Sequence, residues 1–160
     1  QECEHSCFVN KTGIDNRLVH GQVIEAWLPY LRASTLVVVN DALAEDSLQQ
    51  QIMELAIPER VAVRFIPVSA ALDAYESLRQ KTVSSLFLVS SCIDIARMQE
   101  QGLALSIVNV GNIHYAPGKE QICAHVAVSP DEKACLKFLE SSGISLDLLV
   151  CGFGVWWLVV

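Results

Sequence analysis

Short apolar runs alternate with amphipathic stretches along most of the chain. The apolar runs are rich in β-branched residues and short enough for buried strands. The first run has few apolar positions; it is CFVNKTG (7–13). The six later runs are TLVVVN (35–40), VAVRFIPV (61–68), SSLFLVS (84–90), LSIVNVG (105–111), ICAHVAVS (122–129) and ISLDLLV (144–150). Seven strands separated by helices predict an α/β domain with a mainly parallel sheet and helices on both faces.

The stretches between the strands have helical periodicity and recognisable ends. We expect helices in GQVIEAWLPYLRA (21–33), DALAEDSLQQQIMELA (41–56), a Ser69-capped segment through Leu78, IDIARMQEQG (93–102) and SPDEKACLKFLESSG (129–143). Asp41 and Ser129 are predicted N-caps, and Gly102 and Gly143 predicted helix ends. Because no linker or repeat interrupts this order, we predict a single doubly wound domain over residues 1–160.

Composition narrows the class of protein. The 160 residues carry a net charge of −7, which argues against nucleic-acid binding. No apolar run reaches the ~18 residues of a membrane span, and the first residues lack the features of a secretory signal, so we expect a cytoplasmic protein. The six cysteines are scattered and expected to be reduced. Cys3, His5 and Cys7 are too few for a tetrahedral metal site, and we expect neither metal nor cofactor.

The segment IDNRLVHGQV (14–23) has the strongest potential for chemistry. If a helix begins near Gly21, the backbone N–H groups of Gly21, Gln22 and Val23 point towards an anion beside His20. Arg17 adds a guanidinium suited to phosphate oxygens, and Asp15 can fix the tautomer of the imidazole. His20 would then be a nucleophile that carries a phosphoryl group. The alternative is a histidine that only caps the loop, with Asp15 and Arg17 paired on the surface.

IDNRLVHGQVIEAWLP resembles the active-site signature of the IIB components of the mannose (sorbose) family of the bacterial sugar phosphotransferase system. The likeness continues through VVVNDALAED (37–46), IMELAIPERVAVRFIPV (52–68) and VNVGNIHYAPGKEQI (108–122), and spans about residues 14–146. It implies a protein-histidine/sugar phosphotransferase in which Nδ1 of His20 accepts a phosphoryl group from a phosphohistidine of a IIA partner. The group would pass to a sugar that enters through membrane subunits IIC and IID. The sugar and the oligomeric state, a homo-oligomer included, stay open.

The same resemblance suggests that residues of other loops line the site. These are Asn40, Asp41, Ser90, Gly111, Asn112 and Lys119. Each also has an ordinary explanation as a helix cap or turn residue. His114 and His125 are expected to be structural or on the surface. The chain departs from the family at Gly13, where members usually carry an arginine, and after about residue 147.

Two other functions compete with phosphotransfer to sugar. A IIB-like module could report transport status to another protein without phosphorylating sugar. A receiver-like domain phosphorylated on Asp41 would need an acidic pair after the first strand, and FVNKTG contains none. The apolar CGFGVWWLVV (151–160) is expected to pack as an extra strand or against the sheet, or else to form an exposed edge.

Overall fold

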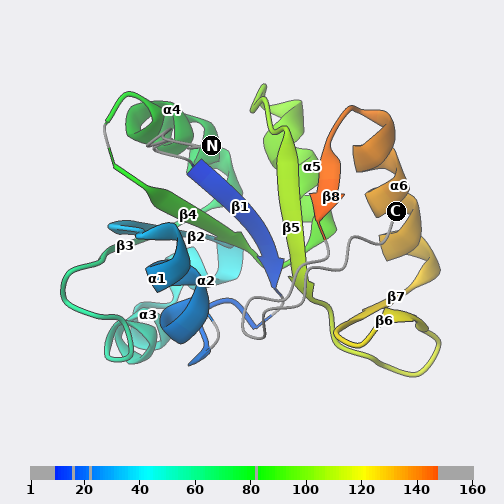
Figure 1. Ribbon diagram of the computed structural model, residues 1–160, viewed down its shortest axis with the longest axis horizontal. Helices are drawn as coiled ribbons and strands as arrows, with labels where there is room; N and C mark the ends of the chain where they lie inside the picture. Colours follow the sequence, from blue (N-terminus) through cyan, green and yellow to red (C-terminus); the bar gives the residue numbers. More distant parts are fainter. Residues whose placement is uncertain (1–9, 16, 22, 82, 148–160) are drawn as a thin grey trace, which may run out of the picture.

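Six parallel strands form the main sheet of the computed structural model, which describes residues 10–15, 17–21, 23–81 and 83–147 (Figure 1). Their order across the sheet is β3-β2-β4-β1-β5-β8, and every pair is parallel. The strands are β1 (Asn10–Asp15), β2 (Thr35–Val39), β3 (Ala62–Ile66), β4 (Ser85–Val89), β5 (Ile107–Asn112) and β8 (Ser145–Asp147). The expected α/β fold with a parallel sheet is confirmed.

Helices cover both faces of this sheet. One face packs against α4 (Ala71–Arg79), α5 (Cys92–Glu100) and α6 (Pro130–Ser141), in a core that centres on Ile14, Val37, Phe87 and Val110. The short η2 (Val68–Ala70) precedes α4. The other core contains side chains of β2 and β4 together with η1 (Val23–Trp27), α1 (Leu28–Leu31), α2 (Asp41–Glu45) and α3 (Ser47–Glu54).

β1 lies inside the sheet, between β4 and β5. The loop after β1 leads to η1 on one face, whereas the loop after β4 leads to α5 on the opposite face. Neighbouring strands whose connections leave to opposite faces open a crevice at their carboxyl ends, where α/β proteins bind ligands. The fold therefore places the segment around His20 at such a crevice.

Two element predictions were wrong. The predicted strand 122–129 is a hairpin of β6 (Glu120–Cys123) and β7 (Val126–Val128), with Ala124 and His125 in the turn. Only a single bridge, Ile113 to Val126, links β7 to the end of β5. The main sheet consequently has six strands rather than seven. The predicted helix 41–56 divides into α2 and α3, because Asp46 leaves the helical conformation and its carboxylate accepts from Gln49 N at 3.0 Å.

The caps show which local signals decide helix ends. Ser129 caps α6 in a reciprocal bond with Glu132, as predicted for the start of this helix. Gly102 and Gly143 have positive φ after α5 and α6, which confirms both ends. Ser69 is not a cap, since it lies inside η2. Asn40 caps α2 instead of Asp41, because the carboxylate of Asp41 bonds to Val68 N.

Several predictions concern residues that the structure does not describe. The Cys3–His5–Cys7 cluster, the segment 151–160 and Gln22 all lie outside the described ranges. Within the described residues, β1 covers Asn10–Asp15, and residues 7–9 of the predicted CFVNKTG strand lie outside them. Among the described cysteines, Cys92, Cys123 and Cys135 are free thiols, as expected.

Candidate active site

A bulge and a left-handed residue shape the loop after β1. Ile14 pairs with Val110 and Asp15 with Asn112, so Gly111 is the extra residue on β5. A Cβ on Gly111 would lie 3.3 Å from Asn109 Oδ1 and 3.9 Å from Asp15 Oδ2, so glycine keeps the space beside Asp15 open. This local irregularity brings Gly111 and Asn112 against the end of β1.

Leu18 turns the chain towards His20. Its backbone has φ +56°, a conformation that costs a leucine about 1–2 kcal/mol. Its side chain is buried in the same core as Leu43 and Val23, and its N–H donates to Asp15 O at 3.0 Å. The burial of Leu18 therefore holds a tight turn in which Asp15 and His20 face each other.

The carboxylate of Asp15 is the centre of the site. Oδ2 lies 2.7 Å from His20 Nε2, and Oδ1 accepts from Arg17 N at 3.0 Å. The guanidinium of Arg17 donates to both oxygens, from Nε at 3.3 Å and from Nη2 at 3.4 Å. The three residues predicted from the sequence are thus brought together around one acceptor. The alternative hypothesis expected Asp15 to pair with Arg17, and this pair is present. The same carboxylate, however, also bonds His20.

These contacts fix the charge state of Asp15. Burial alone would raise the pKa of this carboxyl, but the hydrogen bonds from His20 and Arg17 outweigh it and hold the pKa below its ordinary value. Because an ionised carboxylate only accepts, His20 Nε2 carries a proton towards it. In a neutral ring, Nδ1 then has the lone pair. The His20 side chain is 15% exposed, so the ring is neither hidden in the core nor fully in solvent.

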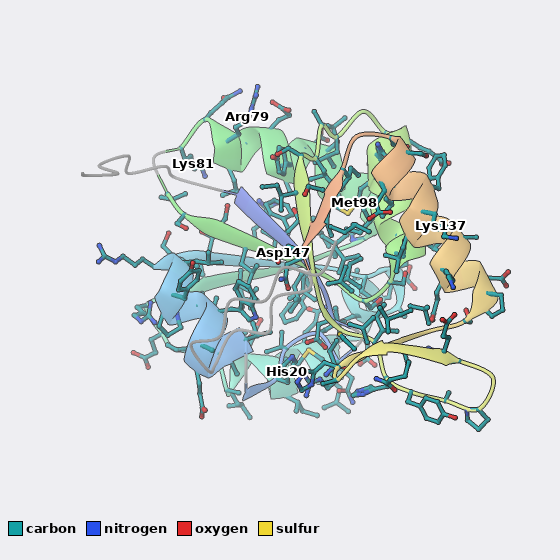
Figure 2. The ribbon with its side chains drawn as sticks, turned by 45° about the vertical axis from the view of Figure 1, so that its right-hand side comes forward. His20, Arg79, Lys81, Met98, Lys137 and Asp147 are labelled. Atoms are coloured by element: carbon teal, nitrogen blue, oxygen red, sulfur yellow. The ribbon has the colours of Figure 1, made fainter. Side chains whose placement is uncertain are left out.

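The helix after His20 has an unusual first part. Ile24 N donates to His20 O, and residues Val23–Trp27 form a π-helix before α1. Pro29 follows in α1 and has no N–H to donate to the carbonyl four residues earlier. Gly21 is exposed at the start of this helix and Val23 is buried. Figure 2 shows His20 at the lower edge of the molecule, the edge at which the strands of the main sheet end.

The family model described as "PTS system sorbose subfamily IIB component" matches residues 10–151. This protein belongs to that family. As a IIB component of the phosphotransferase system (PTS), it is a phosphotransfer component of sugar uptake. The resemblance noted in the sequence is thereby confirmed.

Individual relatives agree with this assignment. The N-acetylgalactosamine-specific phosphotransferase enzyme IIB component 2 of Escherichia coli (strain K12) is 36% identical over 133 residues, which is 82% of this chain and 83% of that one. The mannose-specific EIIAB component of the same organism is 28% identical over 135 residues, 84% of this chain and 42% of that one. A crystal structure of a PTS-dependent N-acetyl-galactosamine-IIB component from Streptococcus pyogenes superposes with a TM-score of 0.80, at 28% identity and 86% coverage of both chains.

In this IIB component, Asn40, Ser90 and Lys119, also predicted for the site, belong to two further groups. Asn40 Oδ1 accepts from Leu43 N, and its Nδ2 donates to Ser90 Oγ at 3.0 Å. This bond ties the loop after β2 to the loop after β4. Lys119 instead forms an ion pair with Glu132 at the start of α6, with Nζ 3.0 Å from Oε1. Its predicted role towards phosphate remains a prediction.

Sequence reasoning missed one charged group near this edge. Arg97 of α5 donates to Asp41 Oδ2 at 2.8 Å and to Asp94 Oδ1 at 3.1 Å. The bond from Val68 N and the Arg97 guanidinium lower the pKa of Asp41. No local pattern could reveal this contact, because it joins residues 56 positions apart. Asp41 therefore connects the start of α2 to Val68 and to α5, a structural role that the receiver-like hypothesis did not include.

A cavity of about 210 Å³ adjoins the site on the face of the sheet that carries α1. Its walls include Asp15 and Gly111, the aromatic residues Trp27 and Tyr30, and Asp147 at the end of β8. Within the part of the chain that the structure describes, there is no cluster of three metal-ligating side chains. Nor is any helix of that part long and apolar enough to cross a membrane.

Proposed function

We propose that Nδ1 of His20 accepts a phosphoryl group from a phosphohistidine of a IIA partner and passes it to a sugar delivered by the membrane subunits IIC and IID. The observation that carries this proposal is the 2.7 Å contact between His20 Nε2 and Asp15 Oδ2. This contact selects the tautomer in which Nδ1 is the nucleophile. The matched mannose-specific EIIAB component, whose name joins IIA and IIB, supports a IIA protein as donor.

In the first step, the P–N bond of the donor phosphohistidine breaks and a new P–N bond forms to Nδ1 of His20. In the second step, that bond breaks while a sugar hydroxyl oxygen bonds phosphorus, and the hydroxyl proton is released. Because the transition state of phosphoryl transfer is loose, positioning and charge supply most of the rate. We assign those tasks to Arg17 and to the backbone N–H groups of Gly21, Gln22 and Val23.

Asp15 is a positioning residue in this scheme. Its carboxylate orients the ring and stabilises the positive charge that the imidazole gains when Nδ1 binds phosphorus. The Asn40–Ser90 bond joins the loops after β2 and β4, and Gly111 and Asn112 lie against the end of β1; we assign all four to the lining of the site. No metal or cofactor takes part in the proposed transfer.

The first prediction concerns the phosphorylated residue. Incubation with a phosphorylated IIA protein should give the wild-type chain a phosphate that is labile to acid and stable to base, and His20→Ala should carry none. The measurement is intact-protein mass spectrometry before and after acid treatment. His114→Ala is the matched control, because His114 is exposed and lies outside the site. Phosphate retained by His20→Ala, or absent from a wild-type chain given a competent donor, contradicts the proposal.

A further inference from the structure

The outer face of α3 is apolar although it is exposed. Leu48, Ile52 and Leu55 are 65%, 51% and 88% exposed. Their spacing of four and three residues places them on one side of α3 and its C-cap. We call these three residues the α3 stripe. Single exposed apolar residues are common on any protein, whereas a contiguous group on one helix face marks an interaction site.

The inner face of α3 belongs to the same hydrophobic core cluster as the loop that carries His20. Met53 joins a core cluster that also contains Leu18 and Val19, directly before His20, and Leu43 of α2. Figure 1 shows α3 at the edge where β1 ends, on the side of the sheet formed by β2 and β3. A protein seated on the α3 stripe would therefore lie beside His20.

The segment that carries the stripe is acidic. Residues 41–57 contain Asp41, Glu45, Asp46 and Glu54 but no lysine or arginine. Glu45, Asp46 and Glu54 are exposed, whereas Asp41 is bonded to Arg97. Charge complementarity favours a partner with basic residues around an apolar contact, and it would speed the encounter.

We infer that the α3 stripe is the docking surface for the phosphodonor protein, whose facing surface is apolar at its centre and basic at its rim. This inference rests on the proposed function, since it requires a protein donor for His20. Three side chains beside the reactive loop make a small interface. Small interfaces are typical of transient complexes, and a donor that must leave after each transfer needs one.

The test compares a protein donor with a small one. Ile52→Asp, and Leu48→Asp combined with Leu55→Asp, should raise KM for a phosphorylated IIA protein that labels the wild-type chain about tenfold, with kcat nearly unchanged. Labelling by phosphoramidate, which needs no docking surface, should proceed at the wild-type rate. Phe138→Asp on α6 is the control, because it adds the same charge at a side chain of similar exposure, 54%.

Other outcomes are decisive as well. A KM in the stripe variants equal to that of the wild type overturns the inference. So does a wild-type chain that sediments as a dimer and an Ile52→Asp variant that sediments as a monomer, because the stripe would then bind a second copy of the chain. Loss of labelling by phosphoramidate in the Asp variants would mean that these substitutions disturb the site itself. Leu55→Ser then tests docking alone, because this side chain is almost fully exposed and its loss leaves the core intact. Normal KM in Leu55→Ser then counts against docking. If neither donor labels the wild-type chain, the proposed function fails at His20, independently of α3.

Discussion

Asp15 shows how one buried carboxylate organises a reactive loop. Its two oxygens accept from His20, from the side chain of Arg17 and from the Arg17 backbone. The backbone bond closes an Asx-turn, a local structure that favours aspartate and asparagine. Of these two residue types, only aspartate offers two acceptor oxygens and a negative charge to His20 and Arg17. We therefore expect the residue type at position 15 to matter more than that at any flanking loop position.

The lowered pKa of Asp15 predicts a pH dependence of stability. A depressed folded-state pKa contributes stability above the ordinary value of 3.8, and this contribution is lost as the pH falls through the folded-state pKa. Asp15→Asn should therefore be less stable than the wild type by about 1–3 kcal/mol near neutral pH. The difference should shrink in strong acid. Urea unfolding at about pH 6 and about pH 3 measures it.

Glu59→Gln is the matched control for Asp15→Asn, because Glu59 is an exposed carboxylate in a turn. Its effect should be small at both pH values. A constant stability difference between the wild type and Asp15→Asn at all pH values would show that the ionised form is not what the fold stabilises.

The nearness of Asp15, Arg17 and His20 was predictable, since six consecutive positions cannot lie far apart. The chemical roles that the sequence suggested for them are the ones proposed here. The sequence left open whether Arg17 faces an anion or pairs with Asp15, and the structure shows the pair, next to a turn in which Leu18 has a positive φ. A leucine carries no local signal for a left-handed backbone. Its burial in the tertiary core holds this conformation.

At the scale of elements, helix boundaries follow side chains that bond the backbone. Ser129, Pro130 and Gly143 marked α6 correctly, because capping box, proline and glycine signals agree there. Asp46 breaks the predicted helix 41–56, since it bonds Gln49 N more readily than it continues a helix. The hairpin β6–β7 was missed because Ala124 and His125 are not residues typical of turns.

The capping box of α6 gives a prediction at this scale. Ser129→Ala removes the acceptor for Glu132 N, and it should lower the free energy of unfolding by about 1 kcal/mol. Ser77→Ala, at an exposed position inside α4, should be neutral or slightly stabilising. Thermal unfolding of both variants measures the difference. Equal stability of Ser129→Ala and the wild type would mean that Pro130 and tertiary packing alone fix the start of α6.

At the scale of the whole molecule, the alternation of strands and helices predicted the fold class but not the strand order. The pattern is the same whichever strands become neighbours. It also could not show that the hairpin leaves the main sheet, because β7 is fully buried like a sheet strand. The apolar sequence of β7 is explained by its burial against α6 and β5, and not by pairing within the main sheet.

This topology predicts uneven protection of backbone amides. Amides of β1, β2, β4 and β5, which have strands on both sides, should exchange with solvent most slowly. Amides of the β6–β7 hairpin should exchange much faster. Its two strands share few hydrogen bonds, and one bridge, Ile113 to Val126, connects the hairpin to the chain after β5. Hydrogen exchange followed by mass spectrometry provides the test. Protection of residues 120–128 equal to that of residues 85–89 would contradict this view of the hairpin as a separate unit.

The central place of β1 also affects how the protein is made. β1 pairs only with β4 and β5, so residues 10–15 have no strand partner until residues 85–89 have left the ribosome. Parallel pairing across so many positions is slow to form. The phosphoryl acceptor proposed here, although it follows directly on β1, would thus not become competent in a newly synthesised molecule until the chain has been made at least through β4.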